Sequence, residues 1–185
     1  AEEVRDIVLA TSGLLNKTIG GPSVKPYQTK GLWEAATSGR GVLATYKQDH
    51  GDALYRRGLY TFIKLTVPPP ALMLFDGSNR DQCEVRRSKT NTPLQALMML
   101  NDPTVLEASR VLSQTLLKQG LSSDDAIKKA FHRIICRNIT EKEQKILVAY
   151  YTEQLQLFTE KKLDAALTLK AGEYPSDEKL DINKS

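Results

Sequence analysis

The stretch Thr90-Asn91-Thr92-Pro93-Leu94-Gln95-Ala96-Leu97-Met98-Met99-Leu100-Asn101-Asp102-Pro103 decides the fold, because it contains two consecutive helix starts. Thr92 stands directly before Pro93, and Gln95 follows three residues after the threonine, which is the spacing of a capping box. Asp102-Pro103 repeats the arrangement of a cap and a first-turn proline. We therefore expect a short helix over 93–100 and a longer one from 103 to about 119. The first is apolar nearly all round, so we expect it to be buried.

Helical patterns continue on both sides of this stretch. Residues 1–15 carry apolar side chains at helical spacing, with Arg5 and three acidic residues mostly on the opposite side. Asp52 can cap a helix that runs towards Leu65, and Thr140 begins a second capping box, Thr-Glu-Lys-Glu. The predicted helical segments are 1–15, 52–65, the short apolar element 71–75, 122–135 and a long helix from 140 to as far as 171.

The first third of the chain is richer in turn residues than the rest. Gly20-Gly21-Pro22-Ser23 and the region around Gly39 interrupt residues 16–50, in which 42–46 is a candidate short strand. The sequence thus predicts a mainly α protein, an irregular helical bundle with a loop-rich N-terminal third. We expect one helical domain over residues 1–175 and a polar, disordered tail over 176–185.

Composition limits the classes of function. The chain has 185 residues, of which 41% are hydrophobic and 26% charged, so it can bury a core without disulfides or metals. No apolar run approaches the roughly 18 residues that a membrane span needs. The net charge of +4 is spread thinly, with acidic residues among the basic ones, so we expect no nucleic-acid partner.

Cysteines and histidines are few. Cys83 and Cys136 form no CxxC or CxxCH motif, so we expect neither a haem attachment site nor a zinc knuckle. A Cys83–Cys136 disulfide and two buried thiols both remain open. The two histidines form no HExxH or HxxxH pair, so we expect no metal and no cofactor in this chain.

Several strings occur in an order that resembles the planctomycete-type domain of unknown function 1553. They are Gly20-Gly21-Pro22-Ser23-Val24, Tyr55-Arg56-Arg57, Val67-Pro68-Pro69-Pro70, Phe75-Asp76 and the stretch from Arg86 to Pro103. The resemblance covers residues 1–175 and suggests the C-terminal piece of a longer domain. It departs at Gly77-Ser78, where Ala-Pro is expected, and at Leu65, where a basic residue is common.

The resemblance implies a cellular location and a domain organisation, but no reaction. Proteins of this type are large, secreted to the periplasm or cell surface, and commonly carry a c-type cytochrome domain. It therefore implies that the partners are other domains of the same polypeptide, and that any haem lies in another domain. It supplies no catalytic residues.

The polar segment 76–91 is the strongest candidate site in the sequence. It holds Asp76, Arg80, Arg86, Arg87 and Asn91 and ends at a helix N-terminus, where an anion is favoured. An arginine there can form paired hydrogen bonds with a carboxylate, phosphate or sulfate. The structural alternative is an internal network of arginines and carboxylates that holds a loop over the core.

His50 and Trp33 complete the candidate set. His50 lies between Asp49 and Asp52, which makes it a faint general-base candidate, and a surface capping role is the alternative. Trp33, Tyr27 and Tyr46 could stack on sugar rings or could form a small cluster under a loop.

Two functions remain open from the sequence. The first is a non-catalytic module that docks onto neighbouring domains or binds an anionic or carbohydrate ligand. The second is a redox or carbohydrate-active catalytic domain with its site in segment 76–91. Whether the protein is an enzyme is therefore undecided by its sequence.

Overall fold

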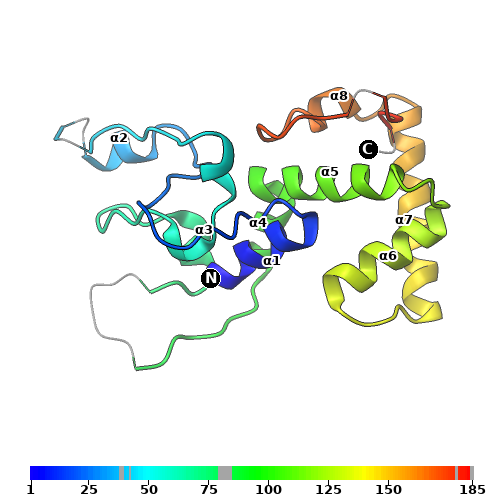
Figure 1. Cartoon of the computed structure of the whole chain (residues 1–185), viewed down its shortest axis with the longest axis horizontal. Coiled ribbons are helices and arrows are strands. Elements are labelled where there is room, and N and C mark those ends of the chain that lie inside the picture. Colours follow the sequence, from blue (N-terminus) through cyan, green and yellow to red (C-terminus); the bar gives the residue numbers. More distant parts are fainter. Residues whose placement is uncertain (38–39, 42, 79–84, 178, 184–185) are drawn as a thin grey trace. The chain divides into compact units, whose positions relative to one another are not determined.

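The computed structural model describes residues 1–37, 40–41, 43–78, 85–177 and 179–183. In these ranges the regular structure is helical, and extended segments pair only in isolated bridges, which confirms a mainly α fold (Figure 1). Contacts divide the chain into unit 1, residues 1–10 and 14–105, and unit 2, residues 11–13 and 106–185. The expectation of one domain over 1–175 stays a prediction.

Helix α1, Glu2–Ser12, forms where the periodicity predicted it. Its apolar side supplies Leu9, which is fully buried. The chain leaves the helix at Gly13, whose φ of 88° is readily available only to glycine. The backbone nitrogen of Leu15 then donates to the carbonyl of Leu9 at 3.1 Å, which closes the helix end.

The helix predicted over 52–65 is wrong. Two 3-10 helices, η1 (Gly51–Tyr55) and η2 (Gly58–Tyr60), replace it. Gly58 passes so close to α1 that a Cβ there would lie 2.7 Å from the carbonyl oxygen of Glu2. Its backbone nitrogen donates to Oδ1 of Asp6 at 2.6 Å.

Further along this segment, the nitrogen of Phe62 donates to the carbonyl of Val24 at 2.8 Å. In this segment, hydrogen bonds to residues far away in the sequence replace the hydrogen bonds of a regular helix. Helix propensity depends on local sequence and therefore could not predict these distant partners.

Arg56 organises the loops of the first third. It is 7% exposed and donates to the carbonyls of Pro22 at 2.7 Å, Thr18 at 3.4 Å and Gly20. Its guanidinium lies over the ring of Tyr60, 3.8 Å from the centroid. Backbone carbonyl groups and the face of an aromatic ring thus stabilise the buried positive charge of Arg56.

The region 16–50 also contains a helix that the sequence did not predict, α2 (Leu32–Thr37). The predicted strand over 42–46 is not formed by 43–46, which make a turn and irregular backbone, and residue 42 lies outside the described residues.

Helix α3, Pro70–Leu74, packs against α4, Pro93–Asn101. The capping box at the start of α4 is confirmed, with the Thr92 hydroxyl accepting from Gln95 N at 3.3 Å and Gln95 Oε1 accepting from Thr92 N at 2.9 Å. The expected burial of α4 is wrong: Gln95 is its buried residue, while Leu94, Leu97 and Leu100 are more than half exposed. An apolar composition did not determine how much of this short helix is covered.

Unit 2 contains most of α5, Pro103–Leu117, followed by α6, Ser123–Ile135, and α7, Glu141–Thr159. Helix α5 ends at Leu117, two residues before the predicted end, and the turn that follows contains Gly120 with a φ of 66°. Helix α6 packs against α7. Both helices begin as predicted, with Ser122 and Thr140 accepting from the backbone nitrogens three residues ahead.

The long helix predicted from 140 towards 171 ends earlier, at Thr159. Lys161 takes a φ of 57°, which a helix cannot accommodate. Asp164 then caps a separate short helix, α8 (Ala165–Thr168), by accepting from Leu167 N at 3.1 Å. Apolar residues occur both before this break, at Leu155 and Phe158, and after it, at Leu163 and Leu167, so the sequence pattern did not reveal the break.

A buried polar row on α5 holds the segment that follows α8. Oε1 of Glu107 accepts from Tyr174 N at 2.6 Å, and Nη2 of Arg110 donates to Tyr174 O at 2.6 Å. Oε1 of Gln114 accepts from Asp177 N at 3.4 Å. Because these α5 residues are three and four positions apart, they share one face of the helix.

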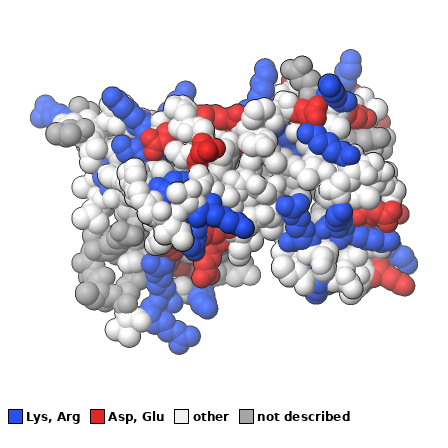
Figure 2. Space-filling model, viewed as in Figure 1, with Lys and Arg blue, Asp and Glu red and all other residues white. Residues whose placement is uncertain are grey.

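None of the helices in the described ranges is long and apolar enough to cross a membrane. On the face seen in Figure 2, basic and acidic side chains lie among one another on the surface of both units.

Candidate functional site

The structure places Asp76 in a short polar contact with Thr90. One carboxylate oxygen accepts from Thr90 N at 2.7 Å, and both accept from the Thr90 hydroxyl at 2.9 Å. The same hydroxyl accepts from Nε2 of Gln95 at 2.9 Å. Asp76 thus fixes the approach of the chain to α4, which is a structural task.

The arginines of the predicted site are exposed where they are described. Arg87 pairs with Glu2, with Nη1 and Oε2 2.7 Å apart. Both partners contact solvent, so this ion pair contributes little stability. Arg86 and Asn91 are also exposed, and Arg80 lies outside the described residues.

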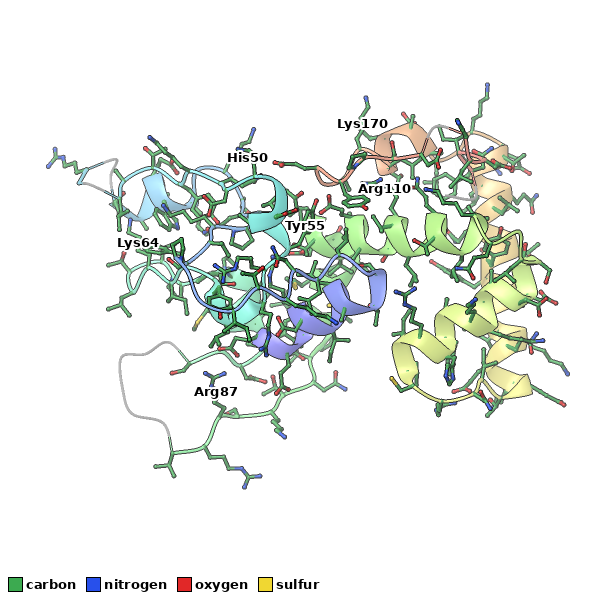
Figure 3. All side chains as sticks on the ribbon, in the orientation of Figure 1. His50, Tyr55, Lys64, Arg87, Arg110 and Lys170 are labelled. Atoms are coloured by element: carbon green, nitrogen blue, oxygen red, sulfur yellow. The ribbon has the colours of Figure 1, made fainter. Side chains whose placement is uncertain are left out.

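Trp33 and His50 occupy different surroundings. Trp33 is 1% exposed and packs against the rings of Tyr46 and Phe62, with centroid distances of 5.0 and 5.8 Å. Its faces are covered by the protein, as in a cluster under a loop. His50 is exposed and directly precedes η1. Figure 3 shows that Arg87 and His50 lie well apart within unit 1, so the predicted residues do not converge on one site.

A different set of residues surrounds a cavity of about 430 Å³ in unit 1. Its apolar wall comes from α1, the 69–75 segment and α4, and includes Val4, Val8, Leu72, Phe75 and Met98. Its polar lining comes from Arg5, Tyr27, Gln28, Tyr46, Thr61, Asp102 and Thr104. A largely apolar cavity of this size with a few polar groups is typical of small-molecule sites.

Arg5 reaches the cavity from α1. Its Nη2 donates to the carbonyl of Leu54, and its Nη1 lies 3.5 Å from the Thr104 hydroxyl. Burial lowers the pKa of Arg5 below its ordinary value, and the negative charge of Asp102 opposes that shift. Its Nε is buried and has no hydrogen-bond partner among the residues that the structure describes. Arg5 therefore gives the cavity lining a positive charge and a hydrogen-bond donor, Nε, that is not used by the described residues.

Two further lining residues have a buried polar atom that no described part of the chain hydrogen-bonds. They are Thr61, through its hydroxyl, and Gln28, through Nε2. Thr61 is 8% exposed. Buried polar atoms are nearly always hydrogen-bonded, so three exceptions around one cavity call for an explanation.

Other polar groups of the lining are already engaged. The Tyr46 hydroxyl donates to the carbonyl of Pro26, and burial raises the pKa of its phenol. Oδ1 of Asp102 accepts from Thr104 N at 2.8 Å and Val105 N at 3.3 Å, which caps α5. These contacts engage Tyr46 and Asp102, whereas Arg5, Gln28 and Thr61 each keep a buried polar atom without a partner among the described residues.

The sequence could not identify this site. Arg5 belongs to the charged side of an amphipathic helix, which is the usual pattern of a solvated face. The sequence groups Tyr27 and Tyr46 with Trp33, and in the structure the two tyrosines line the cavity whereas Trp33 does not. No spacing in the sequence connects residue 5 with residues 28, 61 and 102.

Among the described residues, no group of three or more histidine, cysteine, aspartate or glutamate side chains could hold a metal ion. Cys136 is exposed at the end of α6, so the expectation of two buried thiols is wrong for this residue. A disulfide would need Cys83, which lies outside the described residues, and stays a prediction.

The fold is that of a mainly α protein whose first unit contains a cavity with apolar and polar lining residues. Residues 1–151 match the family model of PSD1, described as a protein of unknown function (DUF1553). The chain therefore belongs to this family, as the resemblance of its motifs predicted. No curated protein and no solved structure matches the chain significantly.

Proposed function

We propose that this chain is a binding module whose unit 1 takes a small carbohydrate, with an anionic sugar as the preferred form. The observation that carries the proposal is the convergence of Arg5, Gln28 and Thr61 on one cavity, each with a buried polar atom that lacks a protein partner. A ligand that supplies their missing hydrogen bonds removes a desolvation cost of about 1–3 kcal/mol for each group.

The chemistry of the lining supports a ligand with many hydroxyl groups. Arg5 and Gln28 offer donors, and the hydroxyl of Thr61 can donate or accept. Asp102 has acceptor capacity beyond the two backbone nitrogens that it caps. Phe75 and the two tyrosines provide aromatic surface for the apolar faces of a ring. A carboxylate on the sugar matches the charge of Arg5.

Thr61→Val gives the sharpest test, because it removes one unpaired hydroxyl and keeps the shape of the side chain. We expect the full chain to bind glucuronate more tightly than glucose in calorimetric titration. Thr61→Val should weaken binding about fivefold, since one hydrogen bond is worth about 1 kcal/mol. The same substitution should leave the chain at least as stable, because the valine has no buried hydroxyl to desolvate.

Arg86→Ala and Arg87→Ala are the matched controls. Both side chains are exposed and lie outside the cavity lining. We expect neither substitution to change the affinity for glucuronate. Unchanged affinity in Thr61→Val would contradict the proposal. A loss caused by Arg86→Ala or Arg87→Ala instead would favour the 76–91 segment as the site.

A docking role is a second proposal, supported by α4. Leu94, Leu97 and Leu100 form an exposed apolar row on this helix, and the resemblance of the motifs suggests other domains of the same polypeptide as its partner. Leu97→Glu should leave the stability of this chain within about 0.5 kcal/mol, as exposed sites usually do. It should abolish association with the remainder of the parent protein in analytical ultracentrifugation. Association equal to that of the natural chain would contradict docking through α4.

The setting of the protein is proposed on the same resemblance. It supports a secreted multidomain protein of the periplasm or cell surface, with a c-type cytochrome domain that carries the haem. Fractionation of cells that produce the parent protein, with haem staining of the recovered polypeptide, tests both parts. A cytoplasmic, haem-free parent protein would contradict this setting.

A further inference from the structure

Unit 2 has a cavity of its own, about 340 Å³ in volume, which the proposed function leaves unexplained. Residues of α5, α7 and α8 line it, together with Leu169, Ile182 and Asn183. Most of its surface is apolar and comes from side chains such as Leu106, Leu155 and Phe158, and the uncharged polar side chains of the lining include Ser109, Ser113, Gln154 and Thr168. Arg110 of α5 is the one charged residue among the described residues of the lining (labelled in Figure 3). A single buried charge in an apolar cavity is costly unless something pairs with it.

The hydrogen bonds of Arg110 are incomplete. The residue is 5% exposed, and its Nη2 donates to the carbonyls of Tyr174 at 2.6 Å and Ala171 at 3.5 Å. Its Nε and Nη1 are buried and have no partner in the described ranges of the chain. Glu107, one turn earlier on α5, is also buried, but it does not line the cavity, and its Oε1 accepts from Tyr174 N at 2.6 Å. Arg110 therefore keeps donors for a further acceptor.

The shape and polarity of the cavity indicate the class of that acceptor. A guanidinium binds a carboxylate through charge-assisted hydrogen bonds, which are stronger in an apolar environment. The surrounding leucines and Phe158 favour an alkyl or aromatic tail over a hydroxylated ring. We infer that unit 2 binds an organic carboxylate with an apolar tail, which places its carboxylate on Arg110 and its tail among Leu106, Leu155 and Phe158. This site differs from the cavity of unit 1 in its residues and in the chemistry of its ligand.

Octanoate is a suitable probe, with 1-octanol as its uncharged counterpart. In the full chain labelled with 15N, the Nε–H signal of Arg110, assigned by its absence in Arg110→Lys, should shift saturably on addition of octanoate. At the same concentration, 1-octanol should leave this signal in place. Octanoate affinity should fall at least tenfold in Arg110→Met, which keeps an unbranched side chain but removes the donors.

Two further variants keep the test decisive if Arg110→Met fails to fold. Leu155→Trp keeps Arg110 and fills the cavity, so it should reduce octanoate affinity at least tenfold. Arg5→Met alters the cavity of unit 1 and should leave octanoate affinity unchanged. The inference is overturned if saturating octanoate leaves the Arg110 signal in place, if octanoate and octanol shift it equally, or if Leu155→Trp binds octanoate like the natural chain. Loss of octanoate binding in Arg5→Met would also overturn the inference. The proposed function of unit 1 is tested separately, by the glucuronate titrations.

Discussion

The backbone nitrogen of Tyr174 donates to Oε1 of Glu107 at 2.6 Å, which links the segment after α8 to a fully buried carboxylate on α5. The two residues are far apart in the sequence. The link depends on a close approach of the backbone at Gly172, where a Cβ would collide with the carboxyl group of Glu107. Gly172 also has a φ of 80°.

Gly172→Ala should therefore destabilise unit 2. The left-handed backbone alone costs a residue with a side chain about 1–2 kcal/mol, and displacing Glu107 adds to this cost. Gly120→Ala is the matched control, because Gly120 has a φ of 66° but no atom within 4 Å of a Cβ. Urea denaturation should show a larger loss for Gly172→Ala, with faster hydrogen exchange at the Tyr174 amide. If both variants lose the same free energy of unfolding, the close approach of Gly172 to Glu107 does not contribute to stability.

Thr92→Ala should destabilise unit 1 by about 1 kcal/mol, because it removes the cap of α4. The neighbouring exposed residue gives a control, since Asn91→Ala should change stability by less than about 0.5 kcal/mol. Urea midpoints and the exchange rate of the Gln95 amide would measure the difference. A Thr92→Ala midpoint equal to that of the natural chain would mean that α4 does not depend on this capping box.

The ion pair between Arg137 and Glu143 predicts a pH dependence. Its two hydrogen bonds, 2.6 and 3.0 Å long, and those from Thr140 lower the pKa of Glu143 from about 4.5 to about 2. A lowered pKa means that the pair stabilises the start of α7 fully above pH 4.5, and that this contribution is lost as the pH falls towards 2.

Carbon-13 NMR titration of the Glu143 carboxyl group tests this value directly. Arg137→Gln should raise the pKa of Glu143 towards 4.5. Arg133→Gln removes a charge from α6 and keeps the ion pair, so the pKa of Glu143 should stay near 2. A pKa near 4.5 in the natural chain would contradict the pairing.

The single tryptophan reports on the aromatic cluster of unit 1. Because Trp33 is 1% exposed, we expect blue-shifted fluorescence that iodide quenches weakly. Trp33→Ala should cost about 3–5 kcal/mol, and Trp33→Phe less, since phenylalanine refills part of the space. Strong iodide quenching, or a Trp33→Ala variant as stable as the natural chain, would show that the ring is exposed and free to stack on a sugar.

Local chemistry predicted the parts of this fold that depend on neighbours in the sequence. The capping boxes at Thr92 and Thr140 and the start of α6 after Ser122 lie where the sequence placed them. Each depends on hydrogen bonds or φ angles within a few residues, so each can be read from a short window.

Distant contacts decided the rest. The helix predicted over 52–65 gave way to bonds between Gly58 and Asp6 and between Phe62 and Val24, whose partners lie far away in the chain. Distant contacts also explain why the cavity of unit 1 is lined by other residues than those predicted in segment 76–91. Arg86 and Arg87 share a segment but remain exposed, whereas Arg5 and Thr61 share no segment and line one cavity.

The sequence by itself determined the family, the mainly α class and the starts of the helices from α4 to α7, because motif strings and caps are properties of adjacent residues. Only the tertiary structure decided which polar side chains are buried without partners. Burial at Arg5, Thr61 and Arg110 depends on what the rest of the chain packs against them, and no local pattern contains that information.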